Sequence, residues 1–513
     1  MPATISAKSA SITHRGARLA LIVIIAVNVA LTTASSFTRI PWWDEGIIVS
    51  PAYNLAYHGF LGTTVQHGRG LPVTAEFPGY DRYTYWALPV YILTLAGWVR
   101  VFGASIIATR ALSVFCGGVL VLAWYIVARR LTGSRLAGLF AAGFVSIDLS
   151  VITAASTTRM DSMTAALGAC GAAAYVSLRR RDIRWALLAA NTFAAAALLT
   201  HPTGFVPVLA LLVLVLYQDW RLLRWSVVPW IAVPYVLFLS GWGLYVLRAP
   251  DVALKQLQAQ AGHRVGGVVI PWKSLQNDFI LRYWQYFYSA KQGIDKLKVL
   301  ILLEYILGVF ALVAIPALRR HRGVRTLALM AGAAYCALAI VDGVKSPHYM
   351  LLTCTLFAAL SGIAAVWAFE TRPAGALAAI ALLLAVQIGG SLQRVRADAF
   401  HRKYTPAIEF LKANKAGYPA PIIGPSELWF GLGPDAVLLD DMRIGYYSGW
   451  RPRWIVTNTF YDGALEGYRQ REPAVWQHIQ SVLQRFDQVF SNDALKIYRE
   501  RQSSSDIDPP ESP

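Results

Sequence analysis

The sequence predicts a polytopic α-helical membrane protein with a small α/β domain after its last membrane span. Three observations support this prediction. The chain of 513 residues is 56% hydrophobic and only 15% charged, whereas about a quarter of the residues of soluble domains are charged. Long apolar runs recur, each long enough to cross a hydrocarbon core of about 30 Å. Arginines cluster in the short segments between these runs, as in the cytoplasmic loops of membrane proteins.

The arginine clusters set the orientation of the predicted spans. They are "RRLTGSR" (129–135), "RRRDIR" (179–184), "RLLR" (221–224) and "RRHRGVR" (319–325). With all four in the cytoplasm beside a basic N-terminus, the chain has about eleven spans and its C-terminus lies outside. The spans are expected near 19–36, 106–128, 136–156, 162–178, 184–200, 204–217, 225–247, 298–318, 325–341, 348–368 and 374–391. Because many spans follow the first, we expect it to be an uncleaved anchor rather than a signal peptide.

One apolar segment, "YTYWALPVYILTLAGWVRVFG" (83–103), does not fit this count. Counting it as a span would move every arginine cluster to the outside. We therefore expect an aromatic-rich interfacial helix in or beside the outer leaflet that does not cross. Two large outer loops follow from this topology, over 37–105 and 248–297. The second contains "RYWQYFYSAKQG" (282–293), whose aromatic and basic side chains suit a membrane surface.

The predicted domains are a transmembrane domain (1–394), an extracytoplasmic α/β domain (395–500) and a disordered tail (501–513). Strand-like runs occur at 420–424, 436–440 and 453–457, and a helical stretch lies at 406–415. The tail is polar and rich in proline and serine. The loop "PSELWFGLGPD" (425–435) suits sugar stacking, although a structural loop with packed aromatic residues accounts for it equally well.

The basic charge and the cysteines do not indicate further functions. The net charge of +18 comes largely from short loops between spans, so we expect no nucleic-acid partner. The cysteines lie in apolar segments without metal-ligand spacing, as small core residues do. They are Cys116, Cys170, Cys336 and Cys354.

Ionisable residues gather at the outer end of the predicted spans. Such groups are costly inside a membrane and mark function. A scatter through the bilayer would indicate an ion pathway, whereas clustering at one face indicates a cavity where a polar headgroup meets carboxylates. The residues are Asp44, Glu45, Asp148, Arg159, Asp161, His201, Glu304, Asp342, Lys345, His348 and Tyr349.

Each member of this group also has a structural interpretation. The adjacent acids Asp44 and Glu45 can be a solvated pair or a helix N-cap. Arg159 and Asp161 can form an ion pair at the end of a span. A histidine before proline, as at His201, often ends a span, and Lys345 can extend its ammonium group to the interface. The joint pattern is stronger than any single residue.

Several segments resemble the GT-C superfamily of membrane glycosyltransferases, of the protein O-mannosyltransferase and lipid A aminoarabinose transferase type. "WWDEGIIVSPAYNLAYHGF" (42–60) resembles the acidic motif of the family's first outer loop. An aromatic segment ending in Phe-Gly and followed by an arginine, and a second acidic motif, also resemble the family. The aromatic segment is "YWALPVYILTLAGWVRVFGASIIATRAL" (85–112), with Arg110, and the second acidic motif is "TTRMDSMTAAL" (157–167). Two more stretches match later segments of the family: "ALLTHPTGF" (197–205) and "VKSPHYMLLTCTLFAAL" (344–360).

The resemblance implies a GT-C fold with a juxtamembrane helix in the first loop, and a polyprenyl-phosphate-sugar donor. It implies Asp44 as general base, Glu45 as its neighbour and Asp161 as the second acidic position, so these three are the candidate catalytic residues. The family's Lys-Pro pair is missing from "PGYDRYTYW" (78–86), where Arg82 is the candidate replacement cation. The candidate ligands of the donor phosphate are Arg82, Arg159, His201, Lys345, His348 and Tyr349.

The chemistry of these residue types agrees with sugar transfer. A carboxylate can take the proton of an attacking hydroxyl, while cations and a phenol stabilise the leaving phosphate. One base without a covalent nucleophile predicts inversion. We assign no metal site and no cofactor, because GT-C relatives differ in their use of a divalent cation. The expected partners are the lipid-linked donor, the membrane, and a lipid, glycan or protein acceptor.

We expect the enzyme in the plasma (inner) membrane, with a cytoplasmic N-terminus and the C-terminal domain outside. The alternative function is a transporter or flippase of a lipid-linked glycan precursor. That class favours internal repeats and helices broken at mid-membrane, and neither pattern is evident in the sequence. A scaffold without enzymatic activity would leave the cluster of charges unexplained.

Overall fold

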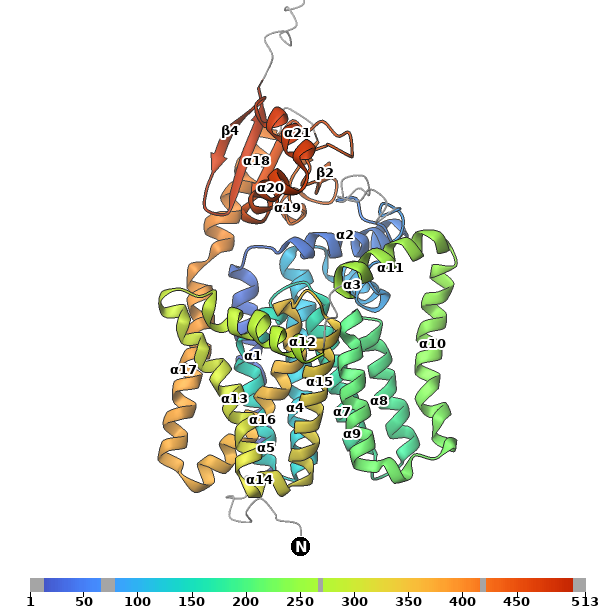
Figure 1. Cartoon of the computed structure of the whole chain (residues 1–513), viewed down its shortest axis with the longest axis vertical. Coiled ribbons are helices and arrows are strands. Elements are labelled where there is room, and N and C mark those ends of the chain that lie inside the picture. Colours follow the sequence, from blue (N-terminus) through green and yellow to red (C-terminus); the bar gives the residue numbers. More distant parts are fainter. Residues whose placement is uncertain (1–12, 66–78, 266–270, 416–420, 502–513) are drawn as a thin grey trace, which may run out of the picture.

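The computed structural model describes residues 13–65, 79–265, 271–415 and 421–501, and it shows a helical bundle capped by a mixed α/β domain (Figure 1). Nearly all of the tail at 501–513, for which disorder is predicted, lies outside the described residues. Within the described part, eight helical segments are long and apolar enough to cross a membrane. Their α-helices are α1 (His14–Thr38), α4 (Ile106–Thr132), α9 (Phe205–Asp219), α10 (Val228–Val246), α13 (Val299–Ala314), α15 (Arg322–Val341), α16 (Leu351–Thr371) and α17 (Pro373–Ala397).

A ninth span is formed if α5 (Arg135–Ile147) and α6 (Leu149–Ala155), which meet at an angle of 60°, are taken together. The other two predicted spans correspond to α7 (Met160–Leu178) and α8 (Ile183–Leu198), which run in the same bundle (Figure 1). By length and apolarity the described chain thus has eight or nine candidate spans, fewer than the predicted eleven. The difference arises because α7 is rich in small and polar residues, and because the 16 residues of α8 rise only about 24 Å.

Helix α3 (Pro89–Phe102) occupies the segment for which no crossing is predicted. Its 14 residues rise about 21 Å, less than the thickness of the hydrocarbon core. It packs against α2 (Trp43–His58) at the same end of the bundle as the C-terminal domain (Figure 1). Its apolar side chains face both ways, with Leu95 and Val99 buried and Val101 and Phe102 exposed. This placement agrees with an interfacial helix.

The long loop after α10 folds into α11 (Pro250–Val265), α12 (Pro271–Asp278), a π-helix η5 (Phe279–Ser289) and a 3-10 helix η6 (Gly293–Lys298). The side chain of Gln256 in α11 accepts hydrogen bonds from the backbone N–H groups of Tyr85 (2.8 Å) and Trp86 (3.1 Å). The two predicted outer loops therefore contact each other directly.

The C-terminal domain contains a five-stranded mixed sheet with the order β2-β1-β3-β5-β4. The parallel strands are β1 (Ile422–Ile423), β2 (Leu438–Leu439) and β3 (Trp454–Asn458), which coincide with the predicted runs. Strands β4 (Phe486–Ser491) and β5 (Leu495–Glu500) add an antiparallel pair that the sequence analysis missed, because their charged positions interrupt the apolar pattern. The helices are α18 (Thr405–Lys415), which coincides with the predicted helical stretch, α19 (Leu428–Leu432), α20 (Thr459–Arg471) and α21 (Pro473–Leu483).

Close backbone packing joins this domain to α2. A Cβ atom at Gly46 would lie 2.1 Å from the carbonyl oxygen of Ser426, so a side chain there would force the two segments apart. The Ser426 hydroxyl donates a hydrogen bond of 2.7 Å to the carbonyl oxygen of Trp43. Helix α17 also continues through the π-helix η8 (Phe400–Tyr404) into α18. These contacts position the domain over the start of α2.

Candidate active site

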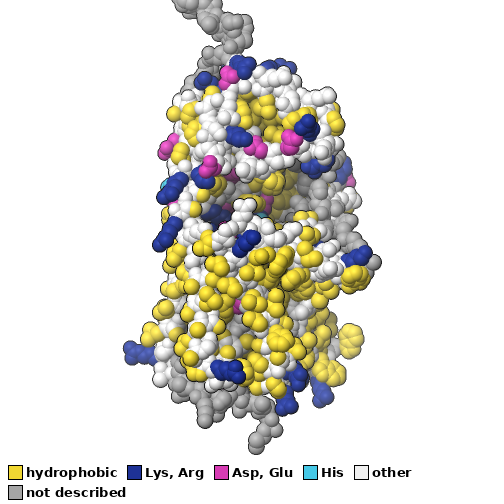
Figure 2. All heavy atoms as spheres, turned by 60° about the vertical axis from the view of Figure 1, so that its left-hand side comes forward, with side chains coloured by type: hydrophobic (Ala, Val, Ile, Leu, Met, Phe, Trp, Pro, Cys, Tyr) yellow, Lys and Arg dark blue, Asp and Glu magenta, His cyan; other side chains and the backbone are white. Residues whose placement is uncertain are grey.

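A cavity of about 580 Å³ lies between the helical bundle and the C-terminal domain. Figure 2 shows the hollow above a belt of apolar side chains, with basic and acidic side chains in and around it. The bundle contributes the end of α1, the segment before α2, α6, the start of α7 and the 3-10 helix η7 (Pro347–Met350). The C-terminal domain contributes Glu427, Asn458 and Phe460. The cavity is therefore the meeting place of segments far apart in the sequence.

Of the adjacent carboxylates at the start of α2, Glu45 is fully buried in a network of hydrogen bonds. It accepts two from Arg110, at 2.9 Å and 2.7 Å, and one each from the backbone N–H groups of Trp42 and Thr158, both at 2.7 Å. Burial favours the neutral acid, but Arg110 and these hydrogen bonds outweigh it and hold the pKa of Glu45 below its ordinary value.

The structure places Glu45, one of the three predicted catalytic residues, in the core beside Arg110. Glu45 does not line the cavity. Its partner Arg110 also donates to the carbonyl oxygens of Ser36 (2.6 Å) and Arg39 (2.9 Å) at the end of α1. The ion pair thus fixes the turn from α1 into α2, which sets the position of the neighbouring Asp44.

Asp44 keeps 30% of its side chain exposed and forms an ion pair with Arg159. The Nε atom of Arg159 donates a hydrogen bond of 2.7 Å to Asp161, so one guanidinium group bridges both acidic motifs. Arg159 and Asp161 line the cavity and are 8% and 4% exposed, respectively. The second oxygen of Asp161, Oδ1, has no hydrogen-bond partner among the described residues. The fold thus brings together the two acidic motifs identified in the sequence.

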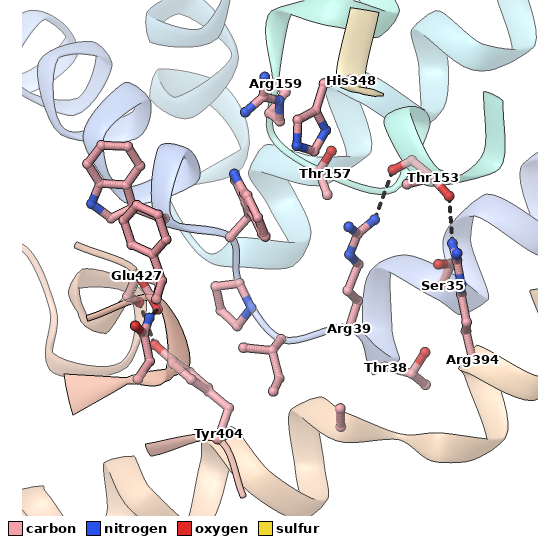
Figure 3. Close-up of a pocket in the computed structure, with 18 of the residues that line it drawn as sticks. Ser35, Thr38, Arg39, Thr153, Thr157, Arg159, His348, Arg394, Tyr404 and Glu427 are labelled. Carbon is pink, nitrogen blue, oxygen red and sulfur yellow. Dashed lines mark hydrogen bonds between the residues drawn. The ribbon is translucent and has the colours of Figure 1, made fainter. Parts of the chain in front are cut away.

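Two further arginines of the cavity, Arg39 and Arg394, were missed by the sequence analysis, although Arg39 closely precedes the first acidic motif. Arg39 donates to the Thr153 carbonyl oxygen (3.1 Å) and Arg394 to the Thr153 hydroxyl (2.7 Å), as Figure 3 shows. Burial, together with the nearby charges of Arg394 and Arg110, lowers the pKa of Arg39 to about 10. Their positions after α1 and near the end of α17 give no signal in the linear chain.

Of the predicted phosphate ligands, Arg159 and His348 line the cavity and lie near each other (Figure 3). The ring centroid of His348 is 5.4 Å from that of Trp42. His201 and Tyr349 are buried outside the cavity lining, with ring centroids 5.0 Å apart. His201 accepts a hydrogen bond from the Thr203 N–H at 3.1 Å. Their role as phosphate ligands stays a prediction.

Arg82 and Lys345, two of the predicted phosphate ligands, lie outside the cavity lining in this structure. The Arg82 side chain is 79% exposed, lies 3.7 Å from Asp81 and does not line the cavity. Lys345 is buried outside the cavity lining, where its ammonium group contacts the Ala339 carbonyl oxygen and lies 3.9 Å from Asp278. Lys345 lies in a segment that resembles the family, whereas Arg82 is the candidate replacement for its missing lysine, and neither side chain reaches the cavity lining.

The other acids of the predicted group at the outer end of the spans also have structural partners. Asp148 caps α6 by accepting a hydrogen bond from the Ser150 N–H (2.8 Å), and it also accepts one from the Tyr305 hydroxyl. Glu304 accepts one from the Gln387 amide at 3.1 Å. Asp342 pairs with Arg282 at 2.8 Å. These three acids belong to the helix packing and not to the cavity.

The C-terminal domain contributes two buried carboxyl groups that the sequence analysis did not single out. Asp440 accepts hydrogen bonds from the Trp43 indole, the Ser426 N–H (2.9 Å) and the Tyr461 hydroxyl (2.5 Å). Burial raises the pKa of Asp440 to about 6. Glu427 lines the cavity, and burial, reinforced by the Asp440 charge, raises its pKa to about 8. These two acids lie where the domain meets the start of α2.

Among the described residues, no group of three histidine, cysteine, aspartate or glutamate side chains is arranged to hold a metal ion.

Solved structures share this fold. The chain is similar to the crystal structure of ArnT from Cupriavidus metallidurans bound to undecaprenyl phosphate, with a TM-score of 0.61 and 14% identity over 93% of this chain and 97% of that one. The apo form of the same protein matches with 16% identity and the same coverage and TM-score. The oligosaccharyltransferase AglB from Archaeoglobus fulgidus, in complex with an inhibitory peptide and a dolichol-phosphate, matches with a TM-score of 0.51, 11% identity and coverages of 96% and 75%.

The chain therefore shares the fold of these transferase structures, and part of its sequence matches a family model. The family that the sequence matches, over residues 88–249, is described as dolichyl-phosphate-mannose-protein mannosyltransferase. The search of curated proteins gave no match. The matched region runs from the start of α3 to the end of α10 and contains both Arg159 and Asp161.

Proposed function

We propose that this enzyme transfers a sugar from a polyprenyl-phosphate donor to an acceptor hydroxyl at the outer face of the plasma membrane, with Asp44 as general base. The ion pair between Asp44 and Arg159 supports this proposal, because it ties a partly exposed carboxylate to an arginine that lines a cation-rich cavity. The C-terminal domain would then lie outside the membrane.

The donor phosphate would bind at the cationic end of the cavity. Arg39, Arg159, Arg394 and His348 line this end, and the three guanidinium groups suit the oxygens of a phosphate. Their charge would stabilise the phosphate monoester that leaves with the electron pair of the broken C–O bond. Because the cavity adjoins the ends of the apolar helices, the prenyl chain could remain in the bilayer while the headgroup reacts.

Asp44 is suited to receive the proton of the acceptor. As the acceptor oxygen forms its bond to the anomeric carbon, a carboxylate within hydrogen-bond reach can remove the hydroxyl proton. Arg159 forms an ion pair with Asp44, and Asp161 fixes Arg159 from the other side. A single displacement without a covalent sugar intermediate inverts the configuration at the anomeric carbon. We therefore assign Asp44 to proton removal, and Asp161 and Arg159 to positioning and phosphate binding.

The test is mass spectrometry of lipid-linked sugars and envelope glycans from cells that carry the wild-type gene, no gene or the variant Asp44→Asn. We expect the gene deletion and Asp44→Asn to show the same accumulated donor and missing glycan, because loss of a general base costs about 10²–10⁴-fold in rate. Asp251→Asn, which changes an exposed acid of α11, is the matched control and should restore the glycan. Full restoration by Asp44→Asn would remove Asp44 from the base role.

A further inference from the structure

The wall of the cavity formed by the C-terminal domain differs chemically from the cationic wall. Figure 3 shows Glu427 and Tyr404 on the opposite side from Arg39, Arg159 and Arg394. Phosphate binding favours positive charge. Among the described lining residues, this second wall offers a cation at Lys403 alone, and Lys403 is paired with Asp493 at 3.1 Å. A ligand group at this wall is therefore expected to be uncharged.

The Glu427 carboxyl group is buried but incompletely bonded. It is 4% exposed, and its Oε1 atom accepts a hydrogen bond of 2.7 Å from the Asn458 amide. Its Oε2 atom has no hydrogen-bond partner among the described residues. A buried polar atom without a partner loses the hydrogen bonds that water gave it and gains none in return. At a cavity wall, such an atom can be satisfied by a ligand.

The surrounding contacts hold Glu427 rigidly in place. The Tyr404 hydroxyl donates to the Glu427 carbonyl oxygen at 2.6 Å. The Asn458 side chain that orients the carboxyl group also caps α20, since its oxygen accepts the Tyr461 N–H at 2.9 Å. The raised pKa of Glu427, about 8, favours a neutral acid near pH 7. A neutral carboxyl group can donate one hydrogen bond and accept another, as neighbouring sugar hydroxyl groups require.

Exposed aromatic rings line the same cavity. Trp42 is 41% exposed and Phe460 is 53% exposed. The ring of Phe460 lies 5.6 Å from that of Trp43, and Trp43 immediately precedes Asp44 in the chain. Exposed rings of this kind offer apolar faces to the C–H groups of a sugar ring. The aromatic surface therefore extends from the C-terminal domain toward the proposed base.

We propose that Glu427 and Phe460 form a carbohydrate subsite for the acceptor, in which the carboxyl group binds a ring hydroxyl and the phenyl ring stacks on the sugar. This inference rests on the proposed function and narrows its acceptor to a glycan. The acceptor sugar would lie on the opposite side of the cavity from the donor phosphate. Asp44, which follows Trp43 in the chain, would then receive the proton of the attacking hydroxyl.

The experiment measures sugar binding separately from lipid-phosphate binding, using the full-length protein in lipid nanodiscs. Saturation-transfer NMR is recorded with the methyl glycosides of mannose, galactose and arabinose, and with a serine- and threonine-containing peptide. The variants are Glu427→Ala, the isosteric Glu427→Gln and Phe460→Ala. Glu409→Gln, an exposed acid on α18, is the matched control. Binding of undecaprenyl phosphate is followed in parallel as a rise in melting temperature.

We expect at least one glycoside to bind to the wild type and to Glu409→Gln, and to bind about tenfold more weakly to Glu427→Ala and Phe460→Ala. Undecaprenyl phosphate should raise the melting temperature of the wild type and of every variant equally. Because Phe460 is exposed, its variant should fold even if Glu427→Ala does not. Glu427→Gln, whose amide can also donate and accept a hydrogen bond, should keep glycoside binding. Unchanged glycoside binding in Phe460→Ala, or binding of the peptide alone, would overturn the acceptor subsite. Absence of undecaprenyl phosphate binding by the wild type would instead contradict the proposed function.

Discussion

The indole of Trp43 donates a hydrogen bond to the carboxyl group of Asp440, 397 residues further along the chain. Trp43 belongs to the first acidic motif, and Asp440 follows the second strand of the C-terminal sheet. The contact therefore ties the domain to the residue next to Asp44. Because Asp440 also accepts from Ser426 and Tyr461, a change in domain position would be transmitted to the proposed base.

Replacing Trp43 by phenylalanine tests this connection. The variant Trp43→Phe keeps an aromatic ring but leaves Asp440 without one of its partners, which should cost about 1–3 kcal/mol. We expect a lower melting temperature and faster proteolysis between α17 and the C-terminal domain. Trp225→Phe, at a position 89% exposed, is the control and should leave both unchanged. Equal melting temperatures for Trp43→Phe and wild type would show that the contact adds nothing to docking.

The adjacent acids Asp44 and Glu45 should separate activity from stability. Glu45→Gln removes the charge that neutralises the buried Arg110, and breaking a buried ion pair costs about 3–5 kcal/mol. We expect that variant to melt at a lower temperature. Asp44→Asn should keep the melting temperature close to that of the wild type while transfer activity falls. Melting curves and transfer assays of both variants in the same nanodisc preparation check this, and a reversed pattern would contradict the assignment.

Glu427 should make the stability of the enzyme depend on pH. The folded state raises its pKa from an ordinary value of 4.5 to about 8. A folded-state pKa above the unfolded value means that the folded protein holds its proton more tightly. The associated stabilisation is complete below pH 4.5 and is lost as the pH rises through about 8. Melting temperatures across this range should fall less steeply for Glu427→Gln than for wild type, whereas Glu409→Gln should follow the wild type.

The two arginines that the sequence analysis missed should control donor affinity. Arg39→Gln and Arg394→Gln each remove one cation from the cavity, and a hydrogen bond to a charged group is worth about 1.5–3 kcal/mol. We expect each to weaken undecaprenyl phosphate binding at least about tenfold in a tryptophan-fluorescence titration. Arg82→Gln, which changes an exposed arginine outside the cavity, should bind like wild type. If Arg82→Gln weakened undecaprenyl phosphate binding more than Arg39→Gln and Arg394→Gln do, the sequence-based assignment of Arg82 as a phosphate ligand would be restored.

The proposed orientation is testable by thiol labelling from either side of sealed vesicles. Cysteines introduced by Arg180→Cys and Arg320→Cys should react from the cytoplasmic side, because both lie in the predicted inner clusters. Asp435→Cys, in the C-terminal domain, should react from the opposite side. If Arg180→Cys and Asp435→Cys react from the same side of the vesicles, the proposed topology is excluded.

Much of the candidate site could be predicted from the sequence because each of its acidic motifs is a short continuous segment. Asp44 and the pair of Arg159 and Asp161 each stand in a short polar segment between apolar runs, so their positions at one end of the bundle follow from the span pattern. Arg39 and Arg394 gave no such signal. Each stands near the end of one long apolar helix, where a lone arginine is common, and only the packing of α1 and α17 directs both to Thr153.

By itself, the sequence determined the membrane class, the position of the non-crossing segment and the grouping of ionisable residues at one face, since all of these follow from apolar length and the cost of burying charge. Only the tertiary structure decided which of these residues share a cavity. Two adjacent carboxylates, Asp44 and Glu45, point in different directions from the first turn of α2, so Glu45 meets Arg110 in the core while Asp44 meets Arg159 at the cavity wall. Glu427 lines the same cavity because the C-terminal domain docks against the start of α2. No local sequence pattern predicts a contact between segments hundreds of residues apart.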